Sequence, residues 1–303
     1  MGDINLSLVV IHAKDAVRFY VKGCNPQSRR YLGYQLLHCR DQLRQDCNKH
    51  HDLWRMHEIW EVERTDAYAF RPVRAVANGG EWECAIRQVG KGDFMGGRIH
   101  GKEFLSEVNF SVDGTARSLD DVGEYQAQVL ELRQLSTLAE HDTQNRVVVA
   151  EKETHWHITT TVMTLTQRIT WFKTLQLNDA YLCMLPIKRL HTQASADAPD
   201  GLPGTEYITD TGARAPDWQP EDLSQEGFTP VYSQSHHARA WSEASGIYAD
   251  VEVVEGWNLP KREFNFSPAP QYNKLYFDFC GEHTVHAGDE WRTKSRYRIT
   301  TKA

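Results

Sequence analysis

The chain of 303 residues carries 34 lysines and arginines against 41 aspartates and glutamates, a formal net charge of -7. This balance excludes a general attraction to nucleic acid or to an anionic membrane, and the length is sufficient for a sizeable core. With no apolar run near the roughly 20 residues of a membrane helix and no secretion-signal pattern at the N-terminus, we expect a soluble protein without classical export and without membrane insertion.

Alternating apolar and polar residues predict extended strands through the first part of the chain. The predicted strands there are 4–13, 16–22, 31–39, 52–64, 68–76, 81–89 and 104–113. Glu58 falls on the more apolar face of its strand. A carboxylate in such a place is at a strand edge, paired with a cation, or part of a site.

The second part of the chain continues the same pattern. Residues 125–138 fit a helix or a strand, and we expect a strand because their neighbours are strands. Pro186 requires an edge or a bulge. The composition of 191–228, rich in Ala, Asp, Pro, Gly and Ser, predicts a long loop that brings Tyr207 and Trp218 over a groove. The other predicted strands are 146–150, 154–172, 181–187, 246–254, 273–280 and 291–299.

About a dozen strands and little demand for helix predict an all-β fold. We expect a single domain over residues 1–303, built as a two-sheet antiparallel jelly-roll sandwich of the concanavalin-like kind with a concave groove. The sequence contains no dinucleotide-binding or P-loop signature, and its six cysteines form no CxxC pair. We therefore expect no cofactor, no zinc ribbon and no dense disulfide framework.

The stretch from Asp93 to Glu103 contains three glycines, which permit backbone conformations or close approaches that a side chain would block. It also carries Arg98, His100 and Lys102. This density of polar groups indicates a functional surface. The alternative is a glycine-rich turn whose polar residues are solvated.

His155 and His157 form an HxH pattern that places both imidazoles on the same face of a strand. Such a pair can bind a metal, orient a substrate or simply be solvated. A cupin-type site needs a glutamate a few residues downstream, where threonines stand instead. A metal would have to recruit His100 or Glu103, so we predict none and assign the two histidines to substrate binding.

Two further segments carry polar groups beside apolar ones. In the first, Lys274 and Tyr276 alternate with an apolar face. In the second, Asn178 and Tyr181 open a strand. Near the C-terminus, the alternating cations Arg292, Lys294, Arg296 and Arg298 indicate a solvated outer face, or a contact with an anionic glycan or a neighbouring chain.

These residue types suit β-elimination on a uronic-acid polysaccharide, which needs a cation at the sugar carboxylate, a base, and an acid for the leaving oxygen. Arg98, Lys102 or Lys274 could neutralise the carboxylate with help from Asn178. A histidine or tyrosine could be the base, with Tyr276 or Tyr181 as the acid. A glycosidase remains open through Glu58, Glu103 and Glu107, whereas no GxSxG elbow supports a serine hydrolase.

The order of these segments resembles the β-jelly-roll polysaccharide lyases of the glucuronan-lyase and alginate-lyase type, and related domains of bacteriophage tail fibres and depolymerases. The resemblance spans about residues 50 to 300 as a pattern. It implies His100 and Tyr276 as the catalytic histidine and tyrosine, with Arg98 and Lys274 as cations. The implied ligand-binding residues are Lys102, Glu103, Asn178, Tyr181, His155, His157 and Trp218.

The resemblance implies an anionic polysaccharide as the partner and a lyase as the activity. The alternative is a carbohydrate-binding or receptor-binding module of a phage tail that holds sugar without cleaving it. That alternative implies assembly in a virion or a homo-oligomer, and action outside the cell.

Overall fold

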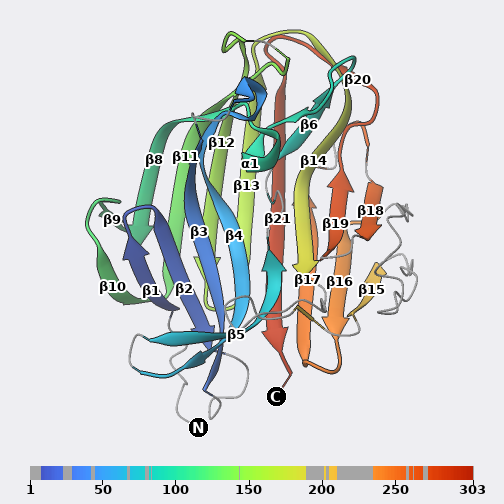
Figure 1. Cartoon of the computed structure of the whole chain (residues 1–303). Helices are drawn as coiled ribbons and strands as arrows, with labels where there is room; N and C mark the ends of the chain where they lie inside the picture. The colour runs from blue at the N-terminus through green and yellow to red at the C-terminus, as the bar shows by residue number, and fades with distance from the viewer. Residues whose placement is uncertain are drawn as a thin grey trace.

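The computed structural model describes residues 8–22, 29–41, 45–66, 69–78, 82, 84–142, 144–188, 201–202, 205–209, 235–256, 259–261, 263–268 and 272–302. These residues form an all-β fold, as predicted, with strands joined into one curled sheet (Figure 1). The helical elements of the described chain are η1 (Cys47–Lys49) and α1 (Gly97–His100). No described helix is long and apolar enough to cross a membrane.

The first ladder begins with antiparallel neighbours that are mostly consecutive in sequence. In spatial order these are β10 (Gly123–Ala127), β1 (Leu8–Ala13), β2 (Ala16–Lys22), β3 (Arg30–Asp41), β4 (His51–Arg64) and β5 (Phe70–Asn78). A pair between Ala77 and Ile187 joins β5 to β14 (Leu175–Lys188).

Strand β14 organises the rest of the first ladder, because four strands pair along it. Besides β5 these are β6 (Ala85–Gln88), β19 (Tyr272–Asp278) and β20 (His283–Val285). Strand β7 (Phe94–Met95) pairs with β6, and β18 (Glu263–Pro268) pairs with β19. Helix α1 follows β7 directly, so it lies beside β6 (Figure 1).

The second ladder is also antiparallel. Its spatial order is β9 (Thr115–Arg117), β8 (Glu103–Val112), β11 (Val129–Ala139), β12 (Val148–Thr159), β13 (Met163–Trp171), β21 (Glu290–Thr301), β17 (Ile247–Glu255), β16 (His237–Ser242) and β15 (Thr205–Thr209). One parallel pair, Asp52 with Phe104, links β4 to β8 and connects the two ladders.

The core lies between the ladders, and period-two burial along the strands creates it. In β13, Leu165, Ile169 and Trp171 are buried while their neighbours are at least partly exposed. Two cross-ladder hydrogen bonds fix the packing. The Gln134 carboxamide of β11 accepts from Trp54 N at 2.9 Å and donates to Trp54 O at 2.8 Å.

The order of the strands differs from the jelly-roll expectation. Most strand pairs join strands that are consecutive in the sequence, which is a meander arrangement. The pair between β4 and β8 makes the sheet continuous, so the fold does not consist of two separate sheets. Residues 125–138 are strands, as predicted. The predicted loop 191–228 lies largely outside the described residues, but β15 falls within it. Short strands such as β7, β9 and β20 were not predicted, because two or three residues are too few to show an alternating pattern.

Candidate functional site

The glycines of the Asp93–Glu103 stretch seat α1 against η1, as predicted for close backbone approaches. Gly101 has φ 78, and a Cβ there would lie 2.6 Å from Lys49 Cα. Gly96 has φ 99, and its Cβ would lie 2.7 Å from the Cys84 sulfur. A side chain at either place meets both backbone strain and a clash, so the turn depends on glycine.

Glu103 anchors this turn from inside the core. Its carboxylate accepts from Lys152 Nζ at 2.9 Å, from Ser136 Oγ at 2.8 Å and from the Gly97 amide at 2.9 Å. Burial alone would raise the pKa of Glu103, but Lys152 and these hydrogen bonds hold that pKa below its usual value. Because Glu103 is fully buried, the structure gives it a structural place and not one against a ligand.

Lys102 is also buried in the turn. Its backbone has φ 62, its amide donates to His50 O at 2.7 Å, and its carbonyl accepts from Ala139 N at 2.9 Å. These bonds tie the turn to two neighbouring segments. Lys102 as a whole is only 3% exposed, so little of this residue is accessible for the predicted contact with a substrate.

His100 stands at the end of α1 with its ring held by a carboxylate. Its Nδ1 lies 2.7 Å from Asp93 Oδ1, and Lys49 forms an ion pair with the other Asp93 oxygen. Burial would raise the pKa of Asp93, but Lys49, the Phe94 amide and His100 leave that pKa lowered. An ionised carboxylate only accepts, so Nδ1 donates to Asp93, and whenever the ring carries a single proton Nε2 is the acceptor.

Aromatic rings connect His100 to the two predicted residues of β19. The Phe94 ring lies 4.9 Å from the His100 ring and 5.8 Å from the Tyr181 ring, measured between centroids. The Tyr181 ring lies 4.9 Å from that of Tyr276, and Lys274 Nζ lies 5.5 Å from the Tyr276 centroid. We call these residues, with Asp93, the His100 surface.

The structure therefore brings together four predicted residues, His100, Tyr181, Tyr276 and Lys274, from three segments far apart in the sequence. The sequence interpretation did not single out Phe94 as their connection or Asp93 as the partner of His100. The signal for both was present, because they open the same glycine-rich stretch that was identified as a functional surface.

Arg87 extends the His100 surface toward β14. Its guanidinium carbon lies 4.6 Å from the Phe94 centroid, and its nitrogen lies 3.6 Å from an Asp179 oxygen. Burial and the nearby Asp278 raise the pKa of Asp179. Asn178 precedes it, and its side-chain oxygen is buried with no hydrogen-bond partner among the described residues.

Arg98 lies in α1 near a second acid–base pair on β4. Burial, Arg55 and Arg98 lower the pKa of His57 to about 4. His57 Nδ1 lies 2.6 Å from an Arg55 nitrogen, and its Nε2 lies 3.3 Å from Glu58 Oε1. Glu58 therefore lies beside a neutral imidazole and also accepts a hydrogen bond from Trp60 Nε1 at 2.8 Å, and the pairing with a cation that its strand pattern allowed is not what these contacts show.

His155 and His157 lie in the second ladder, where they meet Glu131 of β11. His155 Nε2 and His157 Nδ1 lie 3.0 Å and 3.3 Å from the same oxygen, Glu131 Oε1. Within the described chain, these three residues are a group whose ligand atoms could hold a metal ion. The third potential ligand is therefore Glu131 of the neighbouring strand, and not His100 or Glu103. Trp218 lies outside the described residues.

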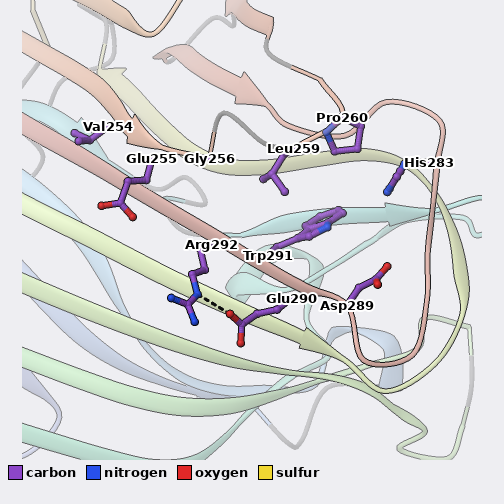
Figure 2. A pocket seen from close by; sticks show the side chains of 10 residues that line it. All are labelled: Val254, Glu255, Gly256, Leu259, Pro260, His283, Asp289, Glu290, Trp291 and Arg292. Carbon is purple, nitrogen blue, oxygen red and sulfur yellow. Dashed lines mark hydrogen bonds and ion pairs between the residues drawn. The ribbon is translucent and has the colours of Figure 1, made fainter.

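A pocket of about 840 Å³ lies apart from these residues, beside β20 and the start of β21. Figure 2 shows Trp291 pointing toward Leu259, while Glu290 and Arg292 contact each other at 2.5 Å. Three of the alternating cations on β21 pair with acids: Arg292 with Glu290, Lys294 with Glu255 and Arg296 with Glu252. This strand therefore presents paired charges, and none of the predicted site residues that the structure describes lines the pocket.

No family model and no curated protein matches the sequence. Solved structures are similar over the whole chain. A protein described as a mutarotase from Salmonella typhimurium is 8% identical, with a TM-score of 0.46, and the match covers 100% of this chain and 96% of that one. Galactose 1-epimerase from Lactobacillus acidophilus NCFM is 8% identical, with a TM-score of 0.43, and the match covers 99% of this chain and 100% of that one. A protein described as an aldose 1-epimerase from Escherichia coli is 11% identical, with a TM-score of 0.41, and the match covers 97% of this chain and 100% of that one.

These matches correct the family resemblance seen in the sequence. They are described as mutarotases and epimerases, not as polysaccharide lyases. The resemblance to glucuronan and alginate lyases and to phage-tail depolymerases is therefore wrong, and so are the β-elimination function and the phage-tail module drawn from it. The matched pattern was shared strand alternation, which many all-β folds have. At these identities and TM-scores, the matches give this chain no activity or substrate.

Proposed function

We propose that the His100 surface binds a carbohydrate and that His100 exchanges a proton with a hydroxyl group of the bound sugar. The observation that carries this proposal is the unbroken row of ring contacts from His100 through Phe94 and Tyr181 to Tyr276. Aromatic faces pack on the apolar C–H faces of sugar rings. All four side chains are partly exposed, which a binding surface needs.

The polar groups of the surface suit the hydroxyls of a sugar. Arg87 and Asp179 are partly exposed and border Phe94, whereas Lys274 borders Tyr276 from a buried position. Donors and acceptors placed around an apolar platform orient a ligand and give it specificity. A neutral or charged sugar has hydroxyl groups for both kinds of partner.

His100 is suited to proton transfer because Asp93 accepts from Nδ1 and keeps Nε2 as the acceptor. A histidine so held can take a proton from a hydroxyl group and return it. Lys49 keeps Asp93 ionised, so the carboxylate orients the ring without competing for the proton. His57, with a pKa of about 4, is a neutral imidazole at neutral pH and lies near Arg98 of α1.

A reaction that needs only such proton transfers is the interconversion of the two anomers of an aldose. His100 takes the proton of the anomeric hydroxyl, the bond between the anomeric carbon and the ring oxygen breaks as the carbonyl forms, and the hydroxyl of Tyr181 or Tyr276 protonates the ring oxygen. Ring closure on either face of the carbonyl reverses both proton transfers. No metal or external cofactor enters this balance. We therefore propose an aldose as the substrate class and anomer interconversion as the activity.

The test is polarimetry on freshly dissolved α-anomers of glucose and galactose, with binding measured separately by ligand-observed NMR. We expect faster mutarotation with the wild-type chain than with buffer. Replacement His100→Ala is expected to remove at least about 100-fold of the rate, the usual contribution of one acid–base group. It should leave sugar binding largely intact, because the rings of Phe94, Tyr181 and Tyr276 remain.

The matched control is His237→Ala, which removes another histidine held by a carboxylate, with Nε2 3.0 Å from Asp250 Oδ1 on the second ladder. It should leave the rate unchanged. Equal rates for wild type and His100→Ala would overturn the catalytic part of the proposal. Absence of binding to any of a panel of aldoses and oligosaccharides would overturn the carbohydrate part.

A further inference from the structure

We propose that Glu131, His155 and His157 form a binding site for a divalent transition-metal ion, with Zn²⁺ the best fit. The site lies on β11 and β12 of the second ladder and is independent of the His100 surface. It includes the two histidines of the HxH pattern, for which the sequence shows no glutamate a few residues downstream.

The strand register creates the group. His155 and His157 project from the same face of β12, while Trp156 between them is fully buried in the core. Glu131 stands directly across from His157 in the antiparallel pair of β11 with β12. Three potential ligands from two neighbouring strands are thus placed on a rigid scaffold.

The distances match the edges of a small coordination shell. Zn²⁺ bound by nitrogen and oxygen at about 2.0 to 2.1 Å in a tetrahedron has ligands about 3.3 Å apart. The two imidazole nitrogens lie 3.0 Å and 3.3 Å from Glu131 Oε1. All three ligand atoms lie within 4.8 Å of one another. Both rings aim at one oxygen, so the ligand atoms converge on a single place.

The donor set and its exposure also suit zinc. Two imidazoles and one carboxylate are a common set of three protein ligands, to which water adds a fourth. The side chains of His155, His157 and Glu131 are 23%, 40% and 24% exposed, so an ion can enter from solvent. Glu131 also lines a pocket of about 420 Å³, which gives room beside the carboxylate.

Neighbouring groups hold the carboxylate in place. Ser111 Oγ donates to Glu131 Oε2 at 3.3 Å, which orients the side chain from β8. Arg133 lies 3.5 Å from Oε1 and is the described cation nearest to this oxygen by its printed contact. Its charge weakens cation binding. Removing it with Arg133→Gln is therefore expected to tighten metal binding.

The experiment uses the full-length chain without a histidine tag, freed of metal with a chelator. Zn²⁺ binding is measured by calorimetry, and Co²⁺ is used as a spectroscopic probe through its visible ligand-field absorption. We expect one ion per chain and a Co²⁺ spectrum of low coordination number. Variants His155→Ala, His157→Ala and Glu131→Gln should each weaken binding at least about tenfold, since even supporting residues have effects of that size.

The matched control is His237→Ala, because His237 is 34% exposed and pairs with one carboxylate but has no second histidine in its group. It should bind Zn²⁺ like the wild type. Thermal unfolding without metal establishes that each variant is folded. Zn²⁺ soaked into crystals provides a test without variants, by its anomalous signal between the three side chains.

Two results would overturn the proposal. One is absence of stoichiometric binding of either ion. The other is a wild-type affinity in the double variant His155→Ala/His157→Ala, which would place the ion elsewhere. In either case the three side chains form only a hydrogen-bonded His–Glu–His group.

Discussion

Lys152 Nζ lies 2.9 Å from Glu103 Oε1, and both side chains are completely buried. This pair connects β12 to the residue that ends the glycine-rich turn. Replacing Lys152→Met leaves a buried carboxylate without its cation, which typically costs about 3 to 5 kcal/mol of unfolding free energy. Urea unfolding measures the loss.

A matched control for that pair joins β12 to β13. Arg168 and Glu153 also approach to 2.9 Å, but their side chains are 43% and 45% exposed. Arg168→Met should cost less than about 1 kcal/mol, because water screens exposed pairs. Similar losses in the two variants would contradict the anchoring role of Lys152.

Gly101→Ala should destabilise the turn and displace His100. The substitution meets strain at φ 78 and a contact with Lys49 Cα. The comparison variant is Gly90→Ala, whose φ is 76 but whose Cβ would have nothing within 4 Å. Gly90→Ala reports the backbone strain alone, about 1 to 2 kcal/mol. We expect a larger loss for Gly101→Ala in thermal unfolding; equal losses would mean that the close approach to η1 is unimportant.

Acid should weaken the fold through His57. Its pKa is about 4 when folded, against an ordinary value of 6.5. Between these values the unfolded chain binds the proton and the folded chain does not, so stability is present above about pH 6.5 and is lost as the pH falls toward 4. The slope is at most about 1.4 kcal/mol per pH unit.

Denaturant unfolding at several pH values checks this slope. His57→Gln should flatten it, because glutamine does not titrate. The exposed His286, replaced in the same way, serves as the control. An unchanged slope in His57→Gln would assign the acid sensitivity to other groups.

Phe94→Leu should weaken sugar binding at the His100 surface. The change removes the ring that contacts both His100 and Tyr181. Loss of one aromatic contact corresponds to about 0.5 to 1.5 kcal/mol, or about 2- to 12-fold in dissociation constant. Ligand-observed NMR titration measures it. Phe172→Leu, at a ring 49% exposed beyond β13, should bind sugar like the wild type.

Local patterning predicted most of the long strands, because each buries alternate residues against the other ladder. Residues such as Leu165 and Trp171 mark their own inward face. The pairing of strands could not be predicted in the same way. Whether β4 meets β8, as it does at Asp52, depends on contacts between distant segments that no local pattern records.

The candidate site was predictable where glycine and a polar cluster coincide, around His100. It was not predictable where a partner comes from another strand. Glu131 is 24 residues from His155 in sequence but belongs to the adjacent strand. Glu103 shows the reverse case, because the sequence places it in a polar stretch whereas the structure buries it against Lys152.

The Gln134 carboxamide presents one donor and one acceptor to the backbone of Trp54, as a peptide group of an adjoining strand would. A side chain thus stands in for a strand neighbour across the interior. Chemistry narrows what can occupy this position. Glutamate could accept from the amide of Trp54 but would repel its carbonyl oxygen. Leucine would leave both the amide and the carbonyl without this hydrogen-bond partner. The side chain at position 134 must therefore match the hydrogen-bonding groups of Trp54 as well as fill the available volume. Without those two groups, a hydrophobic residue of similar size would suffice at this position.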